Sequence, residues 1–240
     1  MRIVPIATGL APIIAIHACY LIAVQYAGLP ACIPYLDGCV SISATGRYPP
    51  ASYLFKAVML PTTMMLCAYW VLNVAWLRSL EKAASLPSRP HRSITILGVG
   101  GALSLVLYVT FLGSAEPFYE FMRRFGVYLY FLFSVIAQLL LAQRSLTHAN
   151  LYGNAALRRI SQVQLLLSVA PFLLGIVNVI LKSLLEDPDT VENIIEWIFA
   201  LMMQVFFLLS YFAWRISDFR AGFSVSGTPD ANRGQDGTAR

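Results

Sequence analysis

The sequence predicts an all-α membrane protein, a six-transmembrane-helix bundle whose N- and C-termini both lie on the cytoplasmic side. Hydrophobic residues make up 58% of the 240 residues and charged residues only 12%, whereas a soluble domain carries about 25% charged residues. The hydrophobic residues gather in long runs, and most basic residues gather in alternate connections between them. One soluble core could not bury so many apolar side chains, so the bilayer must be the solvent for much of the surface.

Each apolar run is long enough to cross a hydrocarbon core of about 30 Å, which takes about 20 helical residues. The runs are continuous rather than alternating, which favours helices over a β-barrel. The predicted helices cover residues 6–27, 53–77, 94–112, 125–142, 163–185 and 191–214. The first run is longer than the apolar core of a typical signal peptide, and no clean A-x-A cleavage site follows it. We therefore interpret it as a membrane helix.

The arginines and lysines predict the orientation, because cytoplasmic connections are enriched in them. With the N-terminus inside, the larger set is cytoplasmic: Arg2, Arg78, Lys82, Arg89, Arg92, Arg144, Arg158, Arg159, Arg215 and Arg220. The smaller set lies outside: Arg47, Lys56, Arg123, Arg124 and Lys182. This placement in short connections is typical of a topology signal, so we expect no nucleic-acid partner despite the net charge of +5.

The predicted domain organisation is a membrane domain over residues 1–219 and a tail over residues 220–240. Within the domain, the outer loop 28–52 is the longest ordered connection and is rich in proline and glycine, which are turn residues. The tail is rich in Gly, Ser, Asp and Arg and has almost no apolar content. We expect the tail to be disordered and cytoplasmic.

Two of the four cysteines, Cys32 and Cys39, lie in this loop. They form a disulfide if the loop faces an oxidising compartment, and otherwise stay as free thiols. Cys19 and Cys67 lie within apolar runs and are expected to be buried and inert. The sequence contains no CxxC motif and no His/Cys cluster, so it predicts no metal site and no cofactor.

Several polar groups fall at membrane depth, where such groups usually face a bundle interior or an aqueous cavity. In the predicted topology all of them lie in the outer half: His17, Lys56, Asn178, Lys182 and Glu196, with Arg123 and Arg124 at the start of the fourth helix. They predict a polar pocket large enough for a lipid headgroup, with Lys56 and Glu196 as candidates for an ion pair. The alternative is that both lysines extend to the interface and the arginines are ordinary surface residues.

Three further patterns concern packing. Gly98 with Ala102, and Gly100 with Ser104, form small-xxx-small pairs, which favour close helix packing within the chain over dimerisation. Pro61 and Pro171 are expected to kink their helices. Interhelical hydrogen bonds are expected from three glutamines: Gln138, Gln164 and Gln204.

The sequence favours a non-catalytic protein. The outer loop offers hydroxyls at Ser41, Ser43 and Thr45, but a nucleophile needs a base within hydrogen-bond reach, and His17 is the one histidine on the outer side. There is no HExxH motif, no GxSxG motif and no glycine-rich phosphate loop. If the protein is an enzyme, the candidate catalytic residues are His17, Lys56 and Glu196.

The outer loop and the helices around it resemble the DRAM family (damage-regulated autophagy modulators), with its FGF-receptor-activating-protein and Sfk branches and the helpers of GPI-anchor lipid remodelling. The loop carries the family-like motif residues Pro34, Tyr35, Ser41, Ser43, Thr45, Gly46, Pro49 and Pro50. Glu196-Trp197 is similar to the Glu-Trp pair that opens the family's last helix. The sequence departs from the family at Ala44, where members carry Asp, and at Arg123 and Arg124, where members often carry a histidine.

The resemblance implies a multipass protein of the plasma membrane or endomembranes whose relatives act in lipid remodelling, autophagy or lipid organisation. We therefore expect a protein that senses, presents or organises lipid at the outer or lumenal leaflet, with lipids and another membrane protein as candidate partners. Trp197 joins the lipid-binding candidates on this basis. The alternatives are an enzyme that remodels GPI anchors or ceramide or acyl groups, and a small channel or transporter.

Overall fold

The computed structural model describes residues 2–87, 90–184 and 188–220, without the side chains of residues 179, 182 and 188. Residues 221–240 of the predicted tail and the residues Met1, Ser88, Arg89, Leu185, Glu186 and Asp187 therefore lie outside the described part of the chain. The helices are α1 (Ile3–Tyr26), α2 (Pro34–Asp37), α3 (Ile42–Thr45), α4 (Ala51–Ala83), α5 (Arg92–Phe111), α6 (Pro117–Leu151), α7 (Ala155–Leu184) and α8 (Pro188–Ile216). Among the described residues, six of these helices are long and apolar enough to cross a membrane. The predicted all-α bundle is confirmed, and the chain is an integral multipass membrane protein.

Three helices are longer than their apolar runs. α4, α6 and α7 continue past the predicted ends into polar sequence such as Arg78–Ala83. A helix satisfies its own backbone hydrogen bonds, so it does not need to stop where the hydrocarbon stops. Apolar runs therefore predicted the membrane-embedded part of each helix better than its ends.

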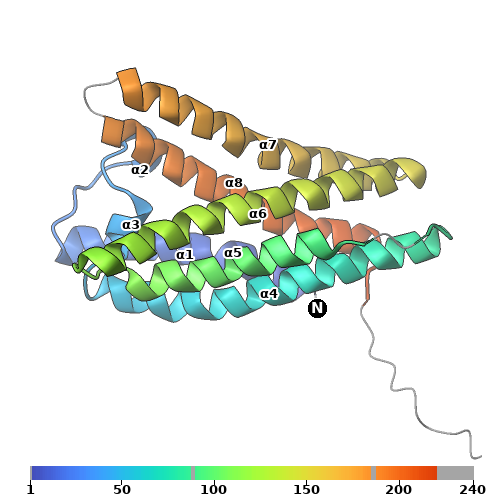
Figure 1. Cartoon of the computed structure of the whole chain (residues 1–240), viewed down its shortest axis with the longest axis horizontal. Coiled ribbons are helices and arrows are strands. Elements are labelled where there is room, and N and C mark those ends of the chain that lie inside the picture. Colours follow the sequence, from blue (N-terminus) through green and yellow to red (C-terminus); the bar gives the residue numbers. More distant parts are fainter. Residues whose placement is uncertain (1, 88–89, 185–187, 221–240) are drawn as a thin grey trace, which may run out of the picture.

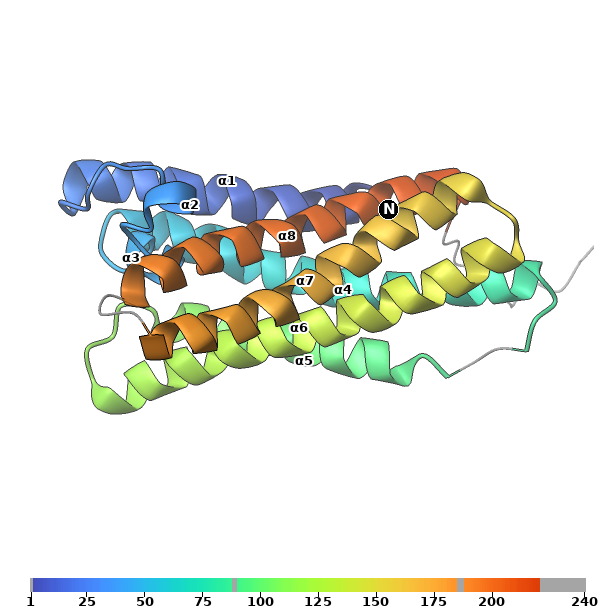
Figure 2. The same cartoon turned by 90° about the horizontal axis from the view of Figure 1, so that it is seen from above.

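The long helices form a closed ring in the order α1, α4, α5, α6, α7, α8, in which each helix contacts the next and α8 returns to α1 (Figures 1 and 2). The short helices α2 and α3 cover one end of the ring, which we call the loop end. At the opposite end, which we call the terminal end, Arg2 forms an ion pair of 2.6 Å with Asp218. The beginning of α1 and the end of α8 are therefore adjacent, as an even number of crossings requires.

Aromatic side chains fill the inside of the ring between α4 and α8. Trp70, Trp76 and Trp214 are almost fully buried. The Trp214 Nε1–H donates to Asn73 Oδ1 at 3.1 Å, and the Trp76 Nε1–H donates to the Ser217 hydroxyl at 2.8 Å. Paired in this way, the polar tips of Trp76 and Trp214 are satisfied in the core, whereas the Trp70 Nε1–H has no hydrogen-bond partner among the described residues.

The small residues of α5 allow close contact within the chain. A Cβ at Gly98 would collide with the Trp70 ring of α4. The reverse contact occurs at Gly126 of α6, where a Cβ would come within 2.6 Å of the Tyr108 backbone nitrogen on α5. The close packing within the chain that these small residues predict is therefore present in the structure.

A buried polar cluster joins three helices at the terminal end. Glu81 of α4 accepts a hydrogen bond of 2.9 Å from His91 Nε2 at the start of α5, and His148 Nε2 of α6 lies 3.6 Å from the same carboxylate oxygen. All three side chains are at most 7% exposed. One carboxylate thus connects α4, α5 and α6 where their apolar contacts end.

We expect Glu81→Leu to lower the free energy of unfolding by about 1–3 kcal/mol, because it removes the acceptor of a buried imidazole donor. Thermal unfolding of the purified protein in detergent measures the change. Arg78→Gln is the matched control, since Arg78 is exposed on the same helix and should stay within about 0.5 kcal/mol of wild type. Equal melting temperatures for the two variants would contradict this role.

The orientation in the membrane stays a prediction from the charge distribution, and it can be tested directly. Leu36 at the loop end is 71% exposed and Leu151 at the terminal end is 63% exposed. In intact cells or sealed vesicles, we expect an impermeant maleimide to label Leu36→Cys from the outer side and to label Leu151→Cys only after permeabilisation. Labelling of both positions from the same side would overturn the threading.

Candidate functional site

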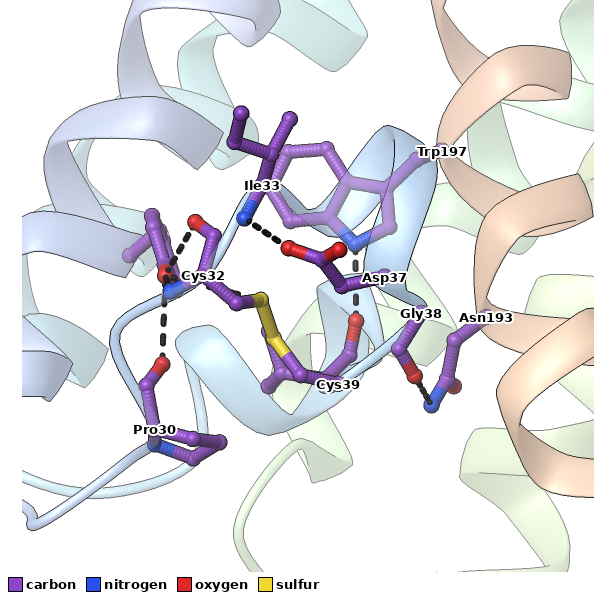
Figure 3. Close-up of a disulfide and its surroundings, with 10 residues drawn as sticks. Pro30, Cys32, Ile33, Asp37, Gly38, Cys39, Asn193 and Trp197 are labelled. Atoms are coloured by element: carbon purple, nitrogen blue, oxygen red, sulfur yellow. Dashed lines mark hydrogen bonds between the residues drawn. A yellow bond between two sulfur atoms is a disulfide. The ribbon is translucent and has the colours of Figure 1, made fainter.

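The first turns of α8 hold the backbone of the outer loop. Asn193 Nδ2 donates to the Gly38 carbonyl at 2.8 Å, and Trp197 Nε1 donates to the Val40 carbonyl at 2.8 Å (Figure 3). Glu196 Oε2 accepts a hydrogen bond of 3.3 Å from the Ile42 N–H. Asn193, Glu196 and Trp197 are three and four residues apart and therefore share one face of α8. This face binds backbone groups of Gly38, Val40 and Ile42, which alternate along the loop.

A second set of contacts closes the loop on itself. The structure forms the predicted disulfide between Cys32 and Cys39 (Figure 3). The Tyr20 hydroxyl of α1 accepts from the Cys32 N–H at 2.8 Å and lies 2.9 Å from the Cys32 carbonyl. Gly38 has a φ of +59°, and a Cβ there would collide with the Thr190 carbonyl of α8. Only glycine combines this conformation with such a close approach.

His17 lies in an aromatic cluster beneath the loop. Its Nδ1 is 2.7 Å from the Ile13 carbonyl, which can only accept, so this nitrogen carries the proton and Nε2 accepts from the Tyr35 hydroxyl at 3.1 Å in the neutral ring. The ring of Trp197 packs edge-on against both His17 and Tyr35. Burial raises the pKa of the Tyr35 hydroxyl, which keeps it a donor.

The predicted polar residues are only partly brought together. The ion pair expected between Lys56 and Glu196 does not form among the described residues, because Glu196 faces the loop while Lys56 follows Phe55, the α4 residue that points inward. Arg124 is 64% exposed and pairs with Glu120 on its own helix. Arg123 is 13% exposed and lies 3.5 Å from the same Glu120 carboxylate oxygen.

Two predicted members of the pocket do not join this group. Asn178 lies on α7, which makes its contacts with α6 and α8 rather than with the outer loop. The side chain of Lys182 lies outside the described part of the structure. The structure therefore assembles His17, Trp197 and Glu196 from the candidate set.

Glu196 also borders a small cavity of about 50 Å³ inside the ring. Its polar lining consists of Glu196, Tyr108, Tyr130 and Gln204, and apolar side chains such as Phe55 and Phe131 complete it. Tyr108 shares a hydrogen bond of 3.0 Å with the Ser43 hydroxyl. The Gln204 side-chain oxygen has no hydrogen-bond partner, although Gln204 is only 5% exposed.

A larger apolar cleft of about 470 Å³ lies between α6, α7 and α8. Phe131 and Phe199, whose ring centroids are 4.8 Å apart, form its inner wall. Pro171 and Gly175 line it from α7. Phe131 also borders the small cavity, so this one side chain separates the cleft from the polar lining around Glu196.

Sequence reasoning missed the cleft and three of the aromatic residues: Tyr108, Tyr130 and Phe131. A weak signal existed, since Pro171 and Gly175 stand four residues apart in α7 and leave little side-chain volume there. Gln204 was expected to make an interhelical hydrogen bond, and its side chain interacts with Tyr130 of α6, while its oxygen borders the cavity without a partner among the described residues. Gln138 and Gln164 do bond across helices, to the Met203 and Phe206 carbonyls of α8.

One of the comparisons with known proteins found a match. A family model described as the Frag1/DRAM/Sfk1/Cwh43P N-terminal domain matches residues 1–217. This range covers all six long helices and the outer loop. Neither the search of curated proteins nor the search of solved structures found a match.

We expect Asn193→Ala and Trp197→Phe each to loosen the outer loop, because each removes one donor to a loop carbonyl. The loss should lower the free energy of unfolding by about 0.5–1.5 kcal/mol per variant and should speed trypsin cleavage after Arg47. Asn178→Ala, which removes the same amide from a helix that does not hold the loop, is the matched control. If all three variants resist trypsin as wild type does, these hydrogen bonds do not hold the loop.

Proposed function

Since the chain belongs to the Frag1/DRAM/Sfk1/Cwh43P N-terminal domain family, we propose that it is a non-catalytic membrane protein that binds a lipid and organises or presents it. The proposed site is the cleft between α6, α7 and α8, in the half of the bundle nearer the loop end. By the predicted orientation this half lies in the outer or lumenal leaflet.

The observation that carries the proposal is an apolar cleft of about 470 Å³ between membrane-spanning helices. Small-molecule sites in proteins typically measure about 300–1,000 Å³. Two of the lining side chains, Ile176 and Ile180, are more than half exposed at the protein surface. Because the medium around them is hydrocarbon, the group that fills such a cleft is an acyl chain.

The polar residues beside the cleft support a binding role. Glu196 borders the small cavity that shares Phe131 with the cleft, and Arg123, which pairs with Glu120 at 3.5 Å, is largely covered by protein. Charged groups at this depth are costly unless they are paired or have a function. An amphiphilic ligand needs an apolar space for its acyl chain beside a polar space for its head group, and the cleft and the small cavity lie next to each other in this way.

The geometry favours binding over the enzymatic alternative. Both ring nitrogens of His17 are engaged, with Ile13 and Tyr35. The Ser43 hydroxyl bonds to Tyr108 and the Thr45 hydroxyl bonds to the Ile42 carbonyl. Within the described residues, none of the hydroxyls of Ser41, Ser43 and Thr45 has His17 as its hydrogen-bond partner, so these candidate nucleophiles are not supplied with the base that they need. Specific roles in GPI-anchor remodelling or autophagy stay predictions from the resemblance.

Gly175→Phe tests the cleft. A Cβ at Gly175 meets nothing within 4 Å, so the added ring can enter the cleft without displacing backbone. We expect labelling by a phospholipid with a photoreactive acyl chain, read on peptides of α6 and α7, to fall about tenfold, which corresponds to about 1.4 kcal/mol of lost binding.

The matched control is Leu173→Phe, which adds a ring at an exposed position of α7 outside the cleft lining. This variant should label as wild type does. Melting temperatures within about 2 °C of wild type for both variants would show that the loss is not unfolding. Unchanged labelling of the α6 peptide in Gly175→Phe would refute the cleft as the lipid site.

A further inference from the structure

The small cavity behind Phe131 has the properties of a site that recognises the polar head group of a lipid. Its polar lining consists of the Glu196 carboxyl group, the hydroxyls of Tyr108 and Tyr130, and the Gln204 amide. Among the described residues the Gln204 side-chain oxygen has no hydrogen-bond partner, and a buried carbonyl oxygen without a partner is uncommon and costs about 1–3 kcal/mol. A group that donates a hydrogen bond to this oxygen would therefore be held in the cavity.

The size of the cavity restricts that group. A volume of about 50 Å³ compares with about 30 Å³ for one water molecule in the liquid. A hydroxyl fits, whereas a phosphodiester with its substituent does not. An ionised phosphodiester also has no proton to donate to the Gln204 oxygen.

Charge also disfavours an ammonium head. The remaining lining is mostly apolar and includes Phe55, Met59 and Leu105. Moving an ammonium ion into such surroundings costs far more than moving a hydroxyl.

We propose that the cavity beside Glu196 and Gln204 selects a neutral lipid with a single hydroxyl head, whose acyl chain lies in the α6–α7–α8 cleft. Phe131 is the common wall, so a rotation of its side chain connects the two spaces. The hydroxyl donates to Gln204 Oε1. This inference rests on the proposed lipid-binding function and adds the chemical class of the lipid.

The test compares three photoreactive lipids in nanodiscs that contain the full-length protein. The probes carry the same diazirine acyl chains on a diacylglycerol, a phosphatidylcholine and a primary-amine head. We expect wild type to be labelled about fivefold more by the diacylglycerol than by the phosphatidylcholine, on peptides that contain Phe131 or Gly175. About fivefold is the effect of one neutral hydrogen bond.

The variant Gln204→Met keeps the side-chain length and removes the acceptor. It should reduce diacylglycerol labelling to the phosphatidylcholine level and leave phosphatidylcholine labelling unchanged. Gln138→Met is the matched control, since Gln138 is equally buried but does not line the cavity, and it should keep the preference. If Gln204→Met does not purify as a folded protein, Phe131→Trp, which thickens the wall, replaces it with the same expected loss of preference.

The outcomes separate this inference from the proposed function. If diacylglycerol and phosphatidylcholine label wild type equally, the cleft remains a lipid site, but the proposal that the cavity selects a hydroxyl head group is overturned. The cavity then holds water only. Stronger labelling by the amine probe would overturn the hydroxyl assignment. Retained preference in Gln204→Met would show that the cavity is not the selector, and labelling by no probe would overturn both proposals.

Discussion

The docking of the outer loop on α8 is the constraint on which the rest of the loop end depends. The loop is mostly irregular, so its carbonyl and N–H groups need partners from elsewhere in the protein. α8 supplies them from Asn193, Glu196 and Trp197, while the Cys32–Cys39 disulfide limits the shapes that the loop can adopt. Without these contacts the cavity beneath the loop would lose its cover.

Glu196 contacts both the outer loop and the small cavity. One carboxylate oxygen holds the Ile42 N–H of the loop, and the side chain also borders the small cavity with Gln204 and Tyr108. Trp197, the next residue, holds the loop and covers His17. The adjacent Glu and Trp therefore connect loop position to cavity shape, so a change in the loop alters the cavity wall through a single helical turn.

The membrane-embedded helices were predictable because the cost of exposing polar groups to hydrocarbon leaves a strong pattern in composition. The pairing of side chains between helices was not predictable in this way. Lys56 and Glu196 were placed at similar depth, yet depth along an axis does not specify rotation about it. Phe55 faces the interior, and Lys56 lies one residue, or about 100°, further around α4. The same uncertainty in rotation hid Tyr108, Tyr130 and Phe131, which look like ordinary apolar residues in a membrane run.

The sequence by itself determined that the chain is a multipass membrane protein with six helices able to cross a membrane, that α5 packs closely, and that the outer loop resembles a known family. Each conclusion follows from local composition or spacing, which act over one helix or one loop. Only the tertiary structure decided which faces meet. It closed the ring from α8 back to α1, left the cleft between α6, α7 and α8, and turned the Gln204 oxygen toward a cavity without a partner. These features depend on how distant helices pack, and no local pattern records that packing.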